Sequence, residues 1–104
     1  MPRYTRCREK FAGALRRLAI GEGDVRERLR GAYWYLHQLT ERDNPPDLRD
    51  DWQQIIEELT RRGPELDRHG EVVETALTHT LGRMRNGTGR RIAERIHMIA
   101  RGLG

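Results

Sequence analysis

The fold is decided by residues 24–46, which read DVRERLRGAYWYLHQLTERDNPP. Apolar residues recur in this stretch at steps of three or four, the helical period, at Val25, Leu29, Ala32, Leu36 and Leu39. Asp24, followed three residues later by Glu27, is typical of a capping box at a helix start. The helix ends before Pro45, because a residue that precedes proline is disfavoured in the helical region. The stretch therefore predicts an amphipathic helix with a defined start and end.

The segments that flank this helix show the same period. Their apolar faces carry Tyr4, Cys7, Phe11, Leu15 and Leu18, then Leu48, Trp52, Ile55, Ile56 and Leu59, then Val72, Val73, Ala76, Leu77, Leu81 and Met84, and last Ile92, Ile96 and Ile99. The expected boundaries are a C-cap at Gly21-Glu22-Gly23, an N-cap at Asp47, a stop at Gly63-Pro64, a C-cap at Asn86-Gly87 and an N-cap at Thr88. No segment has the pattern of a strand. Because the loops are short, we expect one all-α domain over residues 1–104, a compact bundle of four to five short amphipathic helices, mostly antiparallel.

The composition agrees with one small domain that folds by packing alone. A length of 104 residues suits a single domain, and the only cysteine, Cys7, cannot form an internal disulfide. Because Cys7 lies on an apolar helix face, we expect a buried and unreactive thiol. The sequence has no run of about 18 apolar residues, and its first residues lack the apolar stretch of a signal peptide. We therefore expect a cytoplasmic protein that does not enter a membrane.

Charge is distributed unevenly along the chain. Residues 1–20 hold six basic residues and one acidic residue, and residues 76–104 hold the same numbers. Residues 41–75 hold five basic and eleven acidic residues, so the ends of the chain are basic and its middle is acidic. All but one of the basic residues are arginine, whose planar guanidinium suits phosphate and carboxylate groups. Such asymmetry bears on the choice of binding partners.

The sequence lacks the motifs that carry catalysis or bind metal. The four histidines are His37, His69, His79 and His97, and none has a second histidine or a cysteine at the three- or four-residue step of helical metal sites. Helix caps and a solvated helix face explain the carboxylates between residues 41 and 74. No phosphate-binding loop, dinucleotide fingerprint or nucleophile elbow occurs. We therefore expect a protein that is not an enzyme, with no catalytic residue, no metal site and no cofactor.

The most specific local feature is the arginine-rich turn at residues 85–91, which reads RNGTGRR. A glycine-flanked turn at a helix start exposes backbone N–H groups, so this turn either holds a phosphate or only joins two helices. A further interpretation is a helix-turn-helix with residues 88–100 in the DNA major groove. If the first and last helices pack side by side, their basic residues form one face. The predicted nucleic-acid contacts are Arg3, Arg6, Lys10 and Arg17, here called the basic stripe, together with Arg85, Arg90, Arg91 and Arg95.

These observations favour a small nucleic-acid-binding accessory or regulatory protein, with DNA and RNA both open as ligands. The alternative is a protein-interaction module, such as an inhibitor, adaptor or assembly subunit of the kind that phages and plasmids encode. It is indicated by the acidic outer face of the third helix and by Trp34, which points away from the apolar face of its own helix. The predicted partner-facing residues are Trp34, Asp50, Glu57 and Glu58. The same charge layout allows two copies to pair a basic face with an acidic face as a homo-oligomer.

Overall fold

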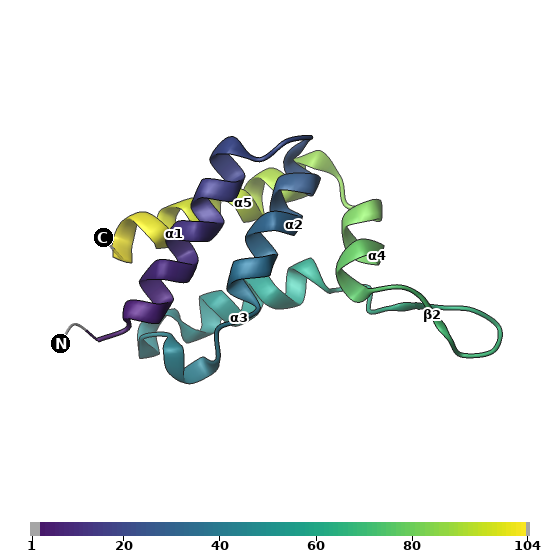
Figure 1. Cartoon of the computed structure of the whole chain (residues 1–104), viewed down its shortest axis with the longest axis horizontal. Coiled ribbons are helices and arrows are strands. Elements are labelled where there is room, and N and C mark those ends of the chain that lie inside the picture. Colours follow the sequence, from purple (N-terminus) through teal and green to yellow (C-terminus); the bar gives the residue numbers. More distant parts are fainter. Residues whose placement is uncertain (1–2, 104) are drawn as a thin grey trace.

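The computed structural model describes residues 3–103, and its helices form a compact bundle (Figure 1). The α-helices are α1 (Thr5–Ile20), α2 (Val25–Leu36), α3 (Arg49–Leu59), α4 (Ala76–Arg83) and α5 (Asn86–Leu103). Two short 3₁₀ helices, η1 (Glu41–Asp43) and η2 (Pro46–Leu48), lie between α2 and α3, and the strands β1 (Glu65–Leu66) and β2 (Val72–Glu74) lie between α3 and α4. The predicted helical bundle is therefore confirmed, with one short hairpin added to it.

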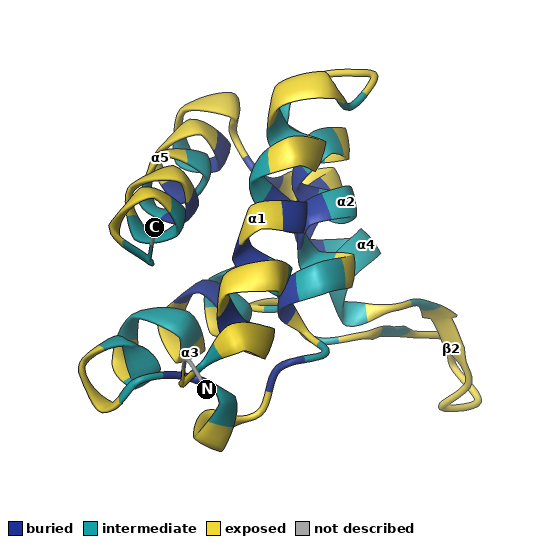
Figure 2. Cartoon of the chain, turned by 60° about the vertical axis from the view of Figure 1, so that its left-hand side comes forward, coloured by how far each residue is buried: buried dark blue, intermediate teal, exposed yellow. Residues whose placement is uncertain are grey.

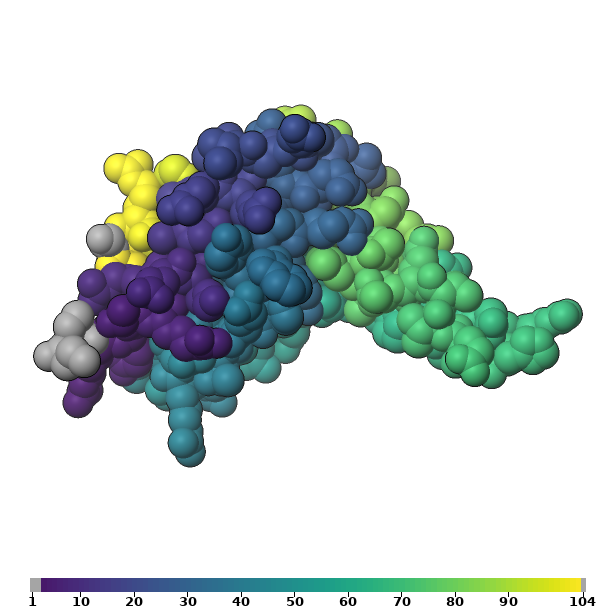
Figure 3. Space-filling model, viewed as in Figure 1, coloured from purple at the N-terminus to yellow at the C-terminus, as the bar shows by residue number. Residues whose placement is uncertain are grey.

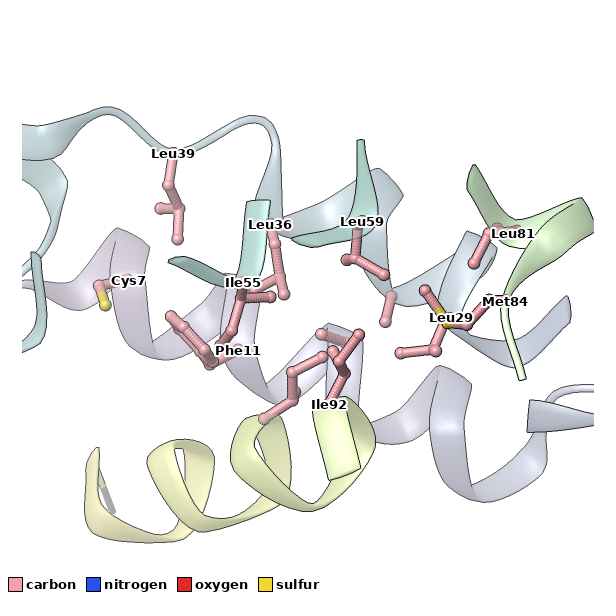
Figure 4. Packing of buried hydrophobic residues seen from close by; sticks show 13 residues of the cluster. Cys7, Phe11, Leu29, Leu36, Leu39, Ile55, Leu59, Leu81, Met84 and Ile92 are labelled. Atoms are coloured by element: carbon pink, nitrogen blue, oxygen red, sulfur yellow. The ribbon is translucent and has the colours of Figure 1, made fainter. Parts of the chain in front are cut away.

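One hydrophobic core joins the helices. Helix α2 contacts all four other helices, and α5 packs against both α1 and α2 (Figure 1). The largest apolar side chains of this core are fully buried and come from every helix (Figure 4): Phe11, Leu29, Leu36, Ile55, Leu59, Leu81, Ile92 and Ile96. Exposed residues cover the outer faces of the same helices (Figure 2). Removal of this apolar surface from water is the main term that favours the fold.

The contact between α1 and α2 leaves no room for an extra carbon atom. Gly13 of α1 lies against the ring of Tyr35 in α2, and a Cβ atom on Gly13 would come within 2.5 Å of two ring carbons. Any side chain at this position would therefore force the Tyr35 ring, or the two helices, to shift. This close approach fixes the orientation of α1 against α2.

Two predictions about this helix pair are confirmed. The Asp24 carboxylate caps α2 by accepting hydrogen bonds from the backbone N–H groups of Arg26 and Glu27. The hydrogen bonds from the Arg26 side chain and the Glu27 backbone lower the pKa of Asp24. Cys7 is fully buried, and burial, with a smaller contribution from the Asp43 charge, raises the pKa of its thiol to about 11. The thiol therefore stays protonated at neutral pH, and it donates a hydrogen bond to Oδ1 of the buried Asn44 at 3.4 Å.

Several predicted helix boundaries are wrong, by one residue at the start of α3 and by more elsewhere. Helix α2 ends at Leu36 and not directly before Pro45. Helix α3 follows Leu48 and not Asp47, because Asp47 lies inside η2. Helix α4 starts at Ala76 with Thr75 as its cap. Helix α5 starts at Asn86, so Thr88 lies inside its first turn and not at its cap. The chain leaves α4 through Met84, which is extended, and a two-residue link therefore joins α4 to α5.

The sequence prediction missed the hairpin. Residues 72–74, which the helical period had assigned to the fourth helix, form β2 and pair antiparallel with β1. The carboxylate of Asp67 closes the turn by accepting hydrogen bonds from the N–H groups of His69 and Glu71, and Gly70 adopts a left-handed φ of 80°. The hairpin projects from the bundle as a narrow arm (Figure 3). Its side chains are mostly exposed, so they contribute little to the core.

Candidate anion-binding groove

A groove of about 740 Å³ lies between the end of α3, helix α4 and the first turns of α5. Met84 and Ile92 supply its apolar wall. Six arginines and only one carboxylate, that of Glu58, line it. We call this surface the arginine groove, after Arg61, Arg62, Arg83, Arg85, Arg91 and Arg95.

Three chain segments bring these arginines together. Arg61 and Arg62 follow α3 directly, and the backbone N–H of Arg62 donates to Thr80 Oγ1 of α4 at 3.0 Å. Arg85 stands in the two-residue link between α4 and α5. Arg91 and Arg95 lie four residues apart and therefore on the same side of α5. The contact of α4 with α3 and the short link from α4 to α5 thus gather residues that are distant in the sequence.

The arginines of the groove differ in how far their charge is neutralised. Arg95 pairs with Glu58 at 3.1 Å and with Asp51 at 3.7 Å, and it also donates to Gln54. Arg83 pairs with Glu74 at a longer 3.5 Å. The other four, Arg61, Arg62, Arg85 and Arg91, make no ion pair with any residue between 3 and 103. The groove therefore keeps an excess of positive charge.

The start of α5 adds to this electrostatic potential. Arg85, which directly precedes α5, and Thr88, which lies in its first turn, both line the groove. The amino end of a helix carries a partial positive charge, and its first N–H groups have no acceptor within the helix. An anion in the groove therefore meets guanidinium groups and the positive end of a helix dipole together.

The basic stripe lies elsewhere on the molecule. Arg6 donates to the Gln38 carbonyl at 3.0 Å and pairs with Asp43 at 3.5 Å, whereas Lys10 donates to Gln38 Oε1 at 2.9 Å. Arg3 and Arg6 line a separate, smaller pocket with Asp43. Arg17 lies against Gly31 of α2. Helices α1 and α5 do pack together, but the basic stripe of α1 is turned toward α2 and the loop that follows it.

Of the eight predicted nucleic-acid contacts, the groove gathers three, Arg85, Arg91 and Arg95. Arg90 is exposed on α5 but does not line the groove. Sequence reasoning missed Arg61, Arg62 and Arg83. The adjacent pair Arg61-Arg62 before Gly63-Pro64 was the one available signal, because a helix end that carries two arginines places both near the following turn.

The predicted partner-facing residues come from two helices, α2 and α3. Trp34 is 62% exposed on the outer side of α2, with its ring 5.7 Å from that of His37. Asp50 and Glu57 are exposed on α3. Glu58 is half-buried and already paired with Arg95, so its charge is not free for a partner.

Comparisons with known protein families, with curated protein sequences and with solved structures find no match to this chain. The function is therefore argued from the geometry of the molecule alone. Among residues 3–103, no helix combines the length and the apolar character needed to cross a lipid bilayer.

Proposed function

We propose that this chain is a small, non-enzymatic nucleic-acid-binding protein with an accessory or regulatory role, and that the arginine groove is its contact surface. The observation that carries the proposal is the gathering of six arginines against one carboxylate, four of them without an acidic partner in the described chain. Like charges repel, so a surface of this kind gains most from an anionic ligand. A nucleic-acid backbone supplies a row of phosphates at regular spacing.

The shape of the groove fits a backbone better than a single small anion. Its arginines come from three segments and line a volume of about 740 Å³, which exceeds the space that one phosphate group fills. Each guanidinium can donate two parallel hydrogen bonds to one phosphate. Contacts of this type hold the ligand without reading its sequence.

We propose for Arg95 a role that differs from the predicted phosphate contact. Its three contacts with Asp51, Gln54 and Glu58 hold α5 against α3. We therefore assign phosphate contact to Arg61, Arg62, Arg85 and Arg91 and treat Arg95 as a residue that positions the helix. Arg90, exposed on the adjoining surface of α5, extends the basic surface.

The test is a titration of the protein with labelled duplex DNA, single-stranded DNA and RNA at about 50 and 200 mM salt. Four phosphate contacts predict a loss of affinity of about 100-fold across that range. Arg85→Ala should weaken binding. It should also reduce the slope of log affinity against log salt concentration by about one, because one fewer counterion is released. The control is Arg16→Ala on α1, an exposed arginine outside the groove that removes the same charge. Absence of binding at 50 mM, or equal losses in the two variants, would contradict the proposal.

A protein partner is the second candidate, and the exposure of Trp34 favours it. A tryptophan that is 62% exposed is a frequent anchor of protein interfaces. Its outer α2 surface also carries the exposed His37. Replacement of Trp34 by alanine should abolish such an interaction and leave the salt-dependent binding of nucleic acid unchanged. Self-association that weakens with salt would identify the partner as a second copy of this chain.

A further inference from the structure

The base of the hairpin brings three potential metal ligands together. Glu65 of β1 and Glu74 of β2 are directly paired across the hairpin, and His79 of α4 lies beside them. One ligand atom from each of these residues lies within 4.8 Å of the other two. All three side chains are half-buried. Three separate segments of the chain therefore meet at this point.

Two features make this cluster unusual for a set of surface carboxylates. Like charges directly opposite each other destabilise a strand pair, yet Glu65 and Glu74 occupy such positions. Glu74 has one cation near it, Arg83 at 3.5 Å, whereas Glu65 has no ion-pair partner between residues 3 and 103. The negative charge of the cluster is thus only partly compensated within the chain.

The histidine is held in the form that binds metal. Nδ1–H of His79 donates to the carbonyl oxygen of Gly63 at 2.9 Å. A carbonyl oxygen only accepts, so Nδ1 carries a proton, and in the neutral ring the lone pair is then on Nε2. Metal-ligating histidines commonly donate their other ring N–H to a backbone carbonyl in this way.

The hairpin also needs a contact to hold it in place. Its strands have two and three residues, and a hairpin of that size has marginal stability by itself in water. Leu66, Val72 and Val73 are all more than half exposed, so apolar packing does not fix the arm to the bundle.

We propose that Glu65, Glu74 and His79 bind one divalent transition-metal ion such as Zn²⁺, which joins the base of the hairpin to α4. One imidazole nitrogen and two carboxylate oxygens suit zinc, with water in the fourth position of a tetrahedral site. A ligand set that includes imidazole favours zinc over the oxygen-preferring ions Mg²⁺ and Ca²⁺. The ion neutralises the paired glutamates and cross-links three segments.

The experiment is a calorimetric titration of the full, tag-free chain with zinc chloride and, separately, with magnesium chloride. The wild-type chain should bind one zinc ion and no magnesium. Glu65→Gln and Glu74→Gln keep the side-chain shape and remove the charge, and His79→Asn keeps a donor for the Gly63 carbonyl but removes Nε2. Each should weaken zinc binding by about tenfold or more. Two control variants in the turn of the same hairpin, Glu71→Gln and His69→Asn, should bind zinc with the affinity of the wild type.

Hydrogen exchange gives a second readout that an adventitious surface ion would not move. Zinc should slow amide exchange in β1 and β2 of the wild type by about tenfold and leave exchange in His79→Asn unchanged. Absence of zinc binding to the wild type would overturn the proposal. So would equal zinc affinity in His79→Asn and the wild type, because the ion would then sit on other residues.

Discussion

The basic stripe of α1 and the arginine groove both carry an excess of positive charge, but their side chains have different neighbours. In the stripe, Arg6 and Lys10 donate to Gln38, and Arg6 also pairs with Asp43. In the groove, Arg61, Arg62 and Arg85 have no acidic partner within residues 3–103 and face an open volume. Two of the four residues of the stripe, Arg6 and Lys10, therefore use hydrogen-bond donors within the chain, whereas four of the six groove arginines have no acidic partner within residues 3–103.

This difference shows why a count of charges along a sequence does not locate a binding surface. Residues 1–20 and 76–104 hold the same number of basic residues. What separates them is the neighbours of each side chain. Gln38 and Asp43 accept from residues of the stripe, whereas carboxylates pair with only two arginines of the groove, Arg83 and Arg95. Whether a charged side chain is available to a ligand depends on which groups it contacts in the folded chain.

The largest expected effect comes from removal of three unpaired groove arginines. The variant Arg61→Ala/Arg85→Ala/Arg91→Ala should lose about 100-fold in affinity for duplex DNA or RNA at 50 mM salt, because three phosphate contacts and their released counterions are lost. The matched variant Arg3→Ala/Arg6→Ala/Lys10→Ala removes the same charge from the stripe and should lose less than about threefold. Fluorescence anisotropy measures both. Equal losses would show that net charge, and not the groove, determines binding.

The next effect distinguishes the structural role of Arg95 from the binding role of Arg91. Arg95→Ala should lower the free energy of unfolding by about 1 kcal/mol, and Tm by about 5 °C, since its ion pairs with Glu58 and Asp51 are partly exposed. Arg91→Ala, one turn away on α5, should leave Tm nearly unchanged and weaken binding instead. Thermal unfolding at low and high salt tests this, because the loss for Arg95→Ala should shrink as salt screens the pairs. If Arg91→Ala destabilises the fold as much as Arg95→Ala, the assignment of roles is wrong.

The helical body was predictable because its signals are local. The period of Leu29 and Leu36 and the Asp24 cap act within one segment, and the structure confirms them. The predicted stop directly before Pro45 is wrong, because α2 already ends at Leu36. The hairpin was missed because Val72 and Val73 continue the helical period toward Ala76, although Asp67 and Gly70 form a turn that precedes them. Two adjacent valines fit either a helix or a strand, and the turn geometry decided between them.

The groove could be predicted only in part. Arg85 and Arg91 stand in the arginine-rich turn, which the sequence displays directly. Arg61 and Arg62 join them only through the packing of α4 and the bond from the Arg62 backbone to Thr80, a contact across 18 residues. The pairing of Arg95 with α3 has the same origin, because it joins residues 37 apart. The spacing of residues in the sequence does not predict contacts between residues that are this far apart along the chain.

The smallest expected effect links the proposed metal site to the groove through Arg83, which pairs with Glu74 and also lines the groove. Zinc bound to Glu74 neutralises that carboxylate and releases Arg83 to the groove, so zinc should raise the affinity for nucleic acid by about two- to threefold, the value of one weak surface ion pair. Anisotropy titrations with and without zinc measure this in the wild type, in His79→Asn and in Arg83→Ala. The gain should vanish in both variants, in His79→Asn because zinc does not bind and in Arg83→Ala because no arginine is released. A gain that persists in His79→Asn would mean that zinc bridges the ligand to other residues, whereas zinc binding without any gain would keep the metal site and remove only its coupling to the groove.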